Sequence, residues 1–171
     1  MEAIIRAFNI QNKNNFLEGK AYWEFGVFRG FSLWFAGVVA RQYNLSDFCF
    51  YGFDSFEGLP KSKVDGMKPA FGKGHYAASY KFVVKRLKEL EVDFTKTKLF
   101  KGFYSKEFFR DLCQSNNLLP ISICTIDVDI YESCVEVLDF IKDHLILVLL
   151  SCLMITIYFT KITITEKEGL C

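Results

Sequence analysis

The chain has 171 residues, of which 51% are hydrophobic and 24% are charged. This composition excludes a disordered protein, which would combine low hydrophobicity with high net charge. Lysine and arginine together number 21 against 20 aspartates and glutamates, so the formal net charge of +1 predicts no general nucleic-acid-binding surface. The length suits one domain, and 19 phenylalanines can build a large core.

Short apolar strands alternate with helices along most of the chain. A helix is expected within residues 1–16. Strands are expected at 20–25, 48–53, 98–103 and 120–127, each followed by a helix, at 31–43, 75–90, 106–115 and 131–144. In the last helix, Val135, Leu138 and Ile141 define an apolar face, joined by Val137 and Phe140. This alternation predicts a doubly wound, mostly parallel α/β sheet, whose ligands bind at the carboxyl ends of the strands.

The segment 57–73 interrupts this alternation with glycines, prolines and lysines. It is long for a loop in a compact domain, and such loops are often lids or binding loops. His75 follows at the start of the expected helix, where a solvated side chain is favoured over one that faces the cleft. His144 is expected to be a partner of the helix C-terminal dipole.

The first candidate site follows the strand 20–25. Gly26 allows a backbone shape closed to other residues and a close approach of ligand to main chain, and Gly30 permits a tight start of the next helix. Glu24 adds an acceptor for an ammonium group. The spacing E-x-G-x-x-x-G differs from the G-x-G-x-x-G of dinucleotide-binding proteins. The alternative is a plain strand–helix turn with glycines for packing.

The second candidate site follows the strand 48–53. Asp54 lies 24 residues after Gly30, where an acidic residue binds ribose hydroxyls in nucleotide-binding folds. A carboxylate suits a diol because it accepts two hydrogen bonds at once. Phe56 is placed to cover an adenine face. The alternative is that Asp54 only caps a turn or helix.

The third candidate site follows the strand 120–127. Asp127 and Asp129 stand so close that their carboxylates repel unless a cation lies between them, and such oxygen ligands suit magnesium or calcium. Asp129 also precedes a helix, with Glu132 in position for a capping box. We therefore expect Asp127 to face the cleft and Asp129 to cap the helix.

Together the three segments WEFGVFRGFS, YGFDSFEGLP and IDVDIYESC resemble the macrocin O-methyltransferase family of class I S-adenosylmethionine-dependent methyltransferases. The resemblance covers residues 18–145. It implies a Rossmann-like sheet, S-adenosylmethionine as the cofactor, Mg²⁺ dependence, and methyl transfer to a hydroxylated small molecule, often a sugar of a natural product.

The resemblance also assigns roles to residues of the three segments. Asp127 is the expected catalytic residue and first metal ligand, and Asp129 belongs to the same metal motif. Gly102, Phe103 and Tyr104 match the segment that flanks the adenine. The expected cofactor-binding residues are Glu24, Gly26, Val27, Phe28, Arg29, Gly30, Ser32, Asp54, Ser55, Phe56, Gly102 and Phe103.

The resemblance ends near Leu145. The family continues with Pro-Gly-Gly and a strand ending in an Asp-Asp pair, whereas residues 145–160 read LILVLLSCLMITIYFT, sixteen residues without a charge. We therefore expect a partial cofactor-binding domain at 1–144 and an anomalous hydrophobic tail at 145–171, from a chain truncated or frame-shifted at this point. A spanning helix needs about 20 apolar residues, so a fifth strand or core helix is favoured over a membrane segment.

Three alternatives to an active methyltransferase remain open at this stage. One is an inactive cofactor-binding remnant, because the Asp pair is missing. Another is an NAD-dependent oxidoreductase, since Asp54 suits that cofactor too, although the glycine spacing counts against it. The third is a membrane-tethered protein. The absence of a signal-peptide pattern and of CxxC pairs predicts a cytoplasmic protein with reduced thiols and no structural zinc site, and leaves a homo-oligomer open.

Overall fold

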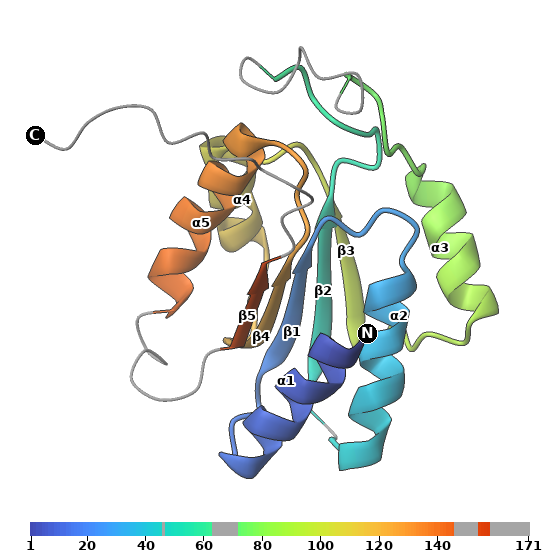
Figure 1. Cartoon of the computed structure of the whole chain (residues 1–171), viewed down its shortest axis with the longest axis vertical. Helices are drawn as coiled ribbons and strands as arrows, with labels where there is room; N and C mark the ends of the chain where they lie inside the picture. Colours follow the sequence, from blue (N-terminus) through green and yellow to red (C-terminus); the bar gives the residue numbers. More distant parts are fainter. Residues whose placement is uncertain (46, 63–71, 146–153, 158–171) are drawn as a thin grey trace, which may run out of the picture.

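A computed structural model describes residues 1–45, 47–62, 72–145 and 154–157 as one α/β sheet flanked by helices (Figure 1). All strand pairs are parallel, and the spatial order is β3-β2-β1-β4-β5. The strands are β1 (Ala21–Phe25), β2 (Cys49–Asp54), β3 (Thr97–Lys101), β4 (Ile121–Ile126) and β5 (Met154–Ile157). The predicted α/β class with a mostly parallel sheet is confirmed.

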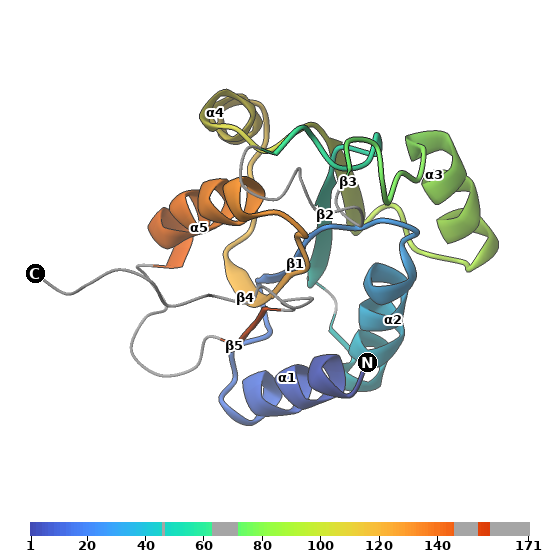
Figure 2. The same cartoon turned by 45° about the horizontal axis from the view of Figure 1, so that its top comes forward.

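The helices cover both faces of the sheet (Figure 2). They are α1 (Glu2–Lys13), α2 (Phe31–Ala40), α3 (Tyr80–Glu89), α4 (Lys106–Ser115) and α5 (Tyr131–Leu145), with a short 3₁₀ helix at Arg41–Tyr43. The first three pack on one face, and α4 and α5 pack on the other. Because both faces are covered, every residue of β1 and of β4 is buried.

The two faces of β1 contribute to two different cores. Tyr22 points into the core beneath α1, α2 and α3, where it stacks near Phe8 with ring centroids 6.4 Å apart. Trp23 and Phe25 point the other way, into an aromatic core that includes Phe109 and Phe140. Burying one such ring stabilises the fold by roughly 1.5–3 kcal/mol, so β1 anchors both layers.

Helix α3 begins later than the sequence pattern indicated. The prediction of a helix from residue 75 is wrong, because the Ser79 hydroxyl caps the helix by accepting a hydrogen bond from Phe82 N at 3.3 Å. His75 instead lies in a turn closed by a hydrogen bond from its own amide to Gly72 O at 3.0 Å. The helix therefore starts at Tyr80, after its capping serine, and not at residue 75.

The buried face of α5 also differs from the prediction. Val137 and Ile141 are buried, as expected for a core face, and Cys134 joins them. Val135 and Leu138 are 43% and 39% exposed, so their assignment to the buried face is wrong. Phe140 packs with Val137 and Ile141 and stacks on Phe109 of α4, with ring centroids 4.0 Å apart.

Within the hydrophobic tail, the structure describes only Met154–Ile157, which form β5 at the edge of the sheet. The register pairs Ile123 with Met154 and Ile126 with Ile157. The rest of the predicted segments 145–160 and 145–171, beyond Leu145 at the end of α5, lies outside the described residues. Among the helices of the described ranges, none combines the length and the hydropathy that crossing a membrane requires.

Candidate active site

A cavity of about 280 Å³ opens at the carboxyl ends of β1, β2, β3 and β4. This is the edge at which doubly wound sheets bind ligands. The strand order reverses between β1 and β4, so the connections after these two strands diverge and leave a crevice. All three candidate segments from the sequence contribute to the cavity wall.

The turn between β1 and α2 is possible only with glycine at its first position. Gly26 has a φ of +91°, and a Cβ atom there would lie 2.1 Å from the carbonyl oxygen of Asp127. At the other end of the turn, Gly30 has a φ of +77° and precedes α2, and its amide donates to Val27 O at 2.8 Å. The close approach of this turn to Asp127 brings the first and third segments together.

Asp54 ties the turn after β1 to the loop after β2. Its Oδ2 accepts a hydrogen bond from Phe28 N at 2.8 Å, and its Oδ1 accepts one from Phe56 N at 2.7 Å. Phe28 and Phe56 both have positive φ angles, of 47° and 55°, which non-glycine residues rarely adopt. The two hydrogen bonds hold these strained residues in place, so Asp54 both lines the cavity and shapes it.

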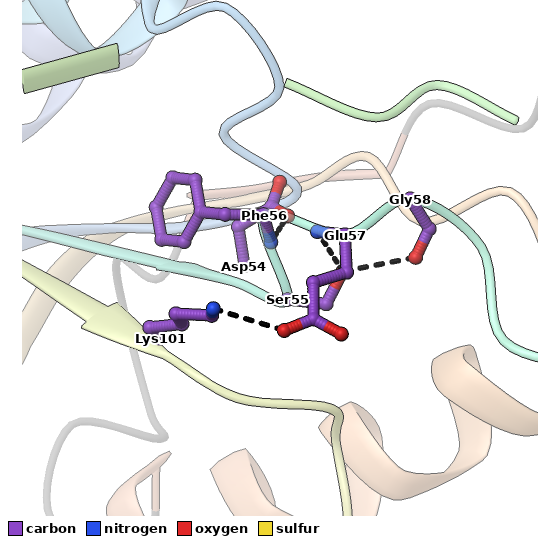
Figure 3. A network of polar contacts seen from close by, with 6 residues as sticks. All are labelled: Asp54, Ser55, Phe56, Glu57, Gly58 and Lys101. Carbon is purple, nitrogen blue, oxygen red and sulfur yellow. Dashed lines mark hydrogen bonds and ion pairs between the residues drawn. The ribbon is translucent and has the colours of Figure 1, made fainter. Parts of the chain in front are cut away.

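The loop after Asp54 is held by a small polar network (Figure 3). The Ser55 hydroxyl donates to Gly58 O at 2.9 Å and accepts from Glu57 N at 3.1 Å. Glu57 in turn forms an ion pair with Lys101 at the end of β3, at 2.9 Å. This pair is half exposed and adds little to stability, but the turn around Ser55 sets the direction of the loop that follows.

The end of β3 forms the next part of the wall. Gly102 N donates to Asp54 O at 2.9 Å, and a Cβ on Gly102 would lie 2.4 Å from the ring of Phe108. Phe103 is 43% exposed and lines the cavity. The Tyr104 hydroxyl donates to Phe53 O at 2.7 Å, and burial together with the nearby Asp54 carboxylate raises its pKa well above the usual value.

Two carboxylates follow β4 at the opposite side of the cavity. Asp127 and Asp129 both line it, so Asp129 faces the cavity as well as preceding α5. Partial loss of hydration and, second, repulsion by Asp129 raise the pKa of Asp127. Glu132, the residue expected in a capping box, accepts a hydrogen bond from Ser62 at 2.9 Å.

Glu24 lies beneath the cavity, with no exposed surface. Its Oε2 accepts from the Tyr22 hydroxyl at 2.7 Å, and its Oε1 accepts from the Ser32 hydroxyl at 2.9 Å. Burial is the main reason that its pKa rises to about 8, opposed by these hydrogen bonds and reinforced by Asp127 and Asp54. Glu24 therefore does not contact a ligand in the cavity directly, and it acts on one only across the turn above it.

The structure separates the predicted site residues into two groups. The first lines the cavity and comprises Gly26, Phe28, Asp54, Ser55, Gly102, Phe103, Asp127 and Asp129. The second shapes or supports the wall from outside and comprises Glu24, Val27, Arg29, Gly30, Ser32 and Phe56. Val27 and Phe56 are buried in the core, and the Arg29 guanidinium lies 5.1 Å from the Phe28 ring centroid. The ring of Phe56 packs against Tyr80 at 5.2 Å.

The wall also contains residues that the sequence did not single out, namely Gly58, Leu59, Pro60, Tyr76, Val128 and Ser133. Leu59 and Gly74 bring two arms of the long loop together: Leu59 N donates to His75 O, and Gly74 N donates to Leu59 O, both at 2.9 Å. This crossing places Tyr76 beside Phe28, with ring centroids 6.2 Å apart. The Gly-Leu-Pro of the second segment could have indicated that Gly58, Leu59 and Pro60 belong to the cavity wall. Nothing nearby in the sequence indicated that Leu59 would pair with Gly74 and His75.

The fold is similar to that of solved methyltransferase structures. One similar solved structure is that of the O-methyltransferase NovP, with 21% identity, a TM-score of 0.66, and coverage of 84% of this chain and 59% of that one. Another is CalS11, a calicheamicin methyltransferase, with 23% identity, a TM-score of 0.67, and coverage of 84% and 60%. The chain thus spans about 60% of the length of these structures. No curated protein sequence matches it.

A family model identifies the chain more closely. The model of the macrocin-O-methyltransferase family matches residues 7–147, which is most of the chain. The chain belongs to the macrocin-O-methyltransferase family. The resemblance seen in the three sequence segments is thereby confirmed.

The described residues fit a metal ion in part. Asp127 and Asp129 offer oxygen ligands at one edge of the cavity, and their mutual repulsion favours a cation there. Within the described ranges, however, no three His, Cys, Asp or Glu side chains gather closely enough to form a metal site. Mg²⁺ commonly binds through one or two carboxylates and keeps several waters, so two carboxylates suit it as a partial site.

Proposed function

We propose that this protein binds S-adenosylmethionine and transfers its methyl group to a hydroxyl of a small-molecule acceptor, such as a sugar of a natural product. The observation that carries the proposal is that the Gly26 turn, Asp54 and Asp127 line one cavity. Membership of the macrocin-O-methyltransferase family supports it, and so does the similarity to two solved methyltransferase structures. The cofactor-binding part is residues 1–144, and we place the protein in the cytoplasm.

The turn after β1 suits the methionine part of the cofactor. Gly26 brings backbone close to the cavity, and the amino end of α2 beyond Gly30 favours a carboxylate. Asp54 suits the ribose hydroxyls although two amides already donate to it, because each carboxylate oxygen has a second lone pair. Phe103 and Tyr104 form an aromatic wall for the adenine.

Asp127 is the proposed catalytic residue. In methyl transfer the acceptor oxygen forms a bond to the methyl carbon while the carbon–sulfur bond breaks, its electron pair stays on sulfur, and the hydroxyl proton leaves. A carboxylate with a raised pKa at the cavity wall is suited to receive that proton. Asp127 and Asp129 would also hold Mg²⁺, which when bound orients a hydroxyl and lowers its proton affinity.

Two measurements test this function. Isothermal titration calorimetry should show binding of S-adenosylmethionine at micromolar concentrations and none of NAD. Incubation with cofactor labelled in the methyl group, Mg²⁺ and a panel of polyhydroxylated acceptors should transfer the label. A protein that binds NAD in preference to S-adenosylmethionine would refute the proposal.

A cofactor-binding protein without turnover is the second candidate. It is favoured by the incomplete metal site at Asp127 and Asp129, because the described residues bring only these two carboxylates together there. It predicts tight cofactor binding in the calorimeter with no label transferred to any acceptor, with or without Mg²⁺. Label transfer by the wild-type protein that is lost in Asp127→Asn would exclude this candidate.

A further inference from the structure

A chain of four polar side chains runs beneath the β1–α2 turn, outside the cavity. Ser32, Glu24, Tyr22 and Thr125 are joined by contacts of 2.9, 2.7 and 2.9 Å between successive side-chain oxygens. Tyr22, Glu24 and Thr125 are all buried. This row of hydrogen-bonded side chains connects α2 to β1 and β1 to β4, so it links the turn to the strand that precedes Asp127.

With Glu24 ionised, these hydrogen bonds have one consistent direction. The Tyr22 hydroxyl has one proton, which it donates to Glu24 Oε2. The Thr125 hydroxyl, 2.9 Å from the Tyr22 oxygen, is then the donor of that second contact. Ser32 donates to the other oxygen of Glu24. Each hydroxyl thus directs a proton towards the carboxylate, which is the arrangement that stabilises a buried negative charge.

The Glu24–Ser32 contact also closes the turn. Glu24 lies two residues before Gly26, and Ser32 lies two residues after Gly30. A hydrogen bond between them at 2.9 Å therefore clamps both ends of the segment that would hold the cofactor. Glu24 is paired with Thr125 in the strand register, so Thr125 stands directly beside it on the same face.

The electrostatic surroundings oppose a charge on Glu24. The titratable groups that interact with it are Asp54 after β2, Asp127 and Cys124 of the β4 segment, Tyr104 after β3 and Tyr22. Burial and the two aspartates raise the pKa of Glu24 to about 8, while the hydrogen bonds from Tyr22 and Ser32 lower it. A cationic ligand above the turn would favour the carboxylate and release a proton.

We propose that Tyr22 and Thr125 are positioning residues for cofactor binding: their hydroxyls hold the Glu24 carboxylate under the Gly26–Gly30 turn as a countercharge for the cationic part of the cofactor. The inference rests on the proposed S-adenosylmethionine-binding function. Tyr22 and Thr125 act through Glu24, because neither lines the cavity.

The test is the pH dependence of cofactor affinity, measured by calorimetry from pH 6 to pH 10. Tyr22→Phe keeps the ring that packs against Phe8 and Phe50 and removes only the hydroxyl. Thr125→Val removes the next hydroxyl in the chain, and Glu24→Gln removes the charge. The cofactor's own titration is common to all proteins and cancels in the comparison with the wild type.

Relative to Glu24→Gln, which shares the cofactor's own titration, wild-type affinity should rise with pH to a plateau as Glu24 ionises. Tyr22→Phe should move this midpoint upward by about one pH unit and weaken binding about tenfold at pH 7, because a hydrogen bond to a charged group is lost. Affinity at pH 10 should then recover to near the wild-type value. Thr125→Val should give a smaller upward shift of the midpoint. Glu24→Gln should lose the part of the pH dependence that comes from ionisation of Glu24.

Three outcomes would overturn the inference in different ways. If the wild type binds but the midpoint is the same in Tyr22→Phe, Tyr22 does not position Glu24. If Tyr22→Phe is weaker by the same factor at every pH, its role is only structural, which thermal unfolding of the same variant would show. If the wild type binds no S-adenosylmethionine at any pH, the proposed function itself fails and this inference with it.

Discussion

The two sides of the cavity differ in how their polar groups are satisfied. On the β1–β2 side, both oxygens of Asp54 and both oxygens of Glu24 accept hydrogen bonds from the protein. On the β4 side, two carboxylates face the cavity and repel each other. The polar groups of the β1–β2 side are hydrogen-bonded without a ligand. The negative charges of the β4 side are compensated only when a cation or a hydrogen-bond donor binds there. Cofactor affinity should therefore depend on the first side, and chemistry on the second.

Among these substitutions, Gly26→Ala should destabilise the β1–β2 side of the cavity most. The new Cβ would lie 2.1 Å from the Asp127 carbonyl oxygen, and the residue would keep a φ near +91°. We expect a loss of at least about 4 kcal/mol in the free energy of unfolding, since the clash is with backbone. Chemical denaturation measures it. Gly37→Ala in α2 is the matched control, because its Cβ would meet nothing within 4 Å, and it should stabilise by up to ~1 kcal/mol.

Glu24→Gln should change the pH dependence of stability. The pKa of Glu24 rises from 4.5 to about 8 on folding, so the folded state binds more protons between these values. Wild-type stability should therefore fall as pH rises from about 5 to 8, and be constant above. At pH 9 the glutamine variant should be more stable by on the order of 3 kcal/mol. Denaturation at pH 6 and pH 9 compares the two, and an equal difference at both would contradict the expectation.

Asp54→Ala should loosen two loops at once. Phe28 N and Phe56 N would lose a charged acceptor, and both residues have positive φ. We expect a loss of about 2 kcal/mol in stability and at least a tenfold loss in cofactor affinity. Asp54→Asn keeps one acceptor oxygen and should fall between alanine and wild type. Equal cofactor affinity in Asp54→Ala and the wild type would remove Asp54 from the binding site.

Asp127→Asn tests the β4 side of the cavity, because the substituted carboxylate lies there. Cofactor affinity should change by less than about threefold, and stability by less than about 1 kcal/mol, since the change also removes repulsion with Asp129. Methyl transfer should fall by at least about a hundredfold. Calorimetry and label transfer on the same preparation separate the two effects. A variant that loses cofactor binding and transfer together would place Asp127 on the cofactor side.

The sequence predicted the elements whose pattern is local. The first four strands and the bounds of α4 followed from apolar runs and turn residues. The burial of Glu24 could not be predicted, because it depends on Tyr22, Ser32 and Thr125 converging from three elements. Phe56 looked like an adenine-covering ring, but it packs against Tyr80 of a helix whose start the sequence had misplaced.

The order of the strands has a consequence for how the chain folds. Central β1 pairs with β2 within about 30 residues, but its other neighbour is β4, where Ala21 pairs with Ile121. Such distant pairs form slowly, because a long loop must close first. During synthesis one edge of β1 therefore stays open until residues near 126 have emerged. In that interval a buried apolar strand exposes unpaired amides and carbonyls, which is when misassociation with another chain is most favourable.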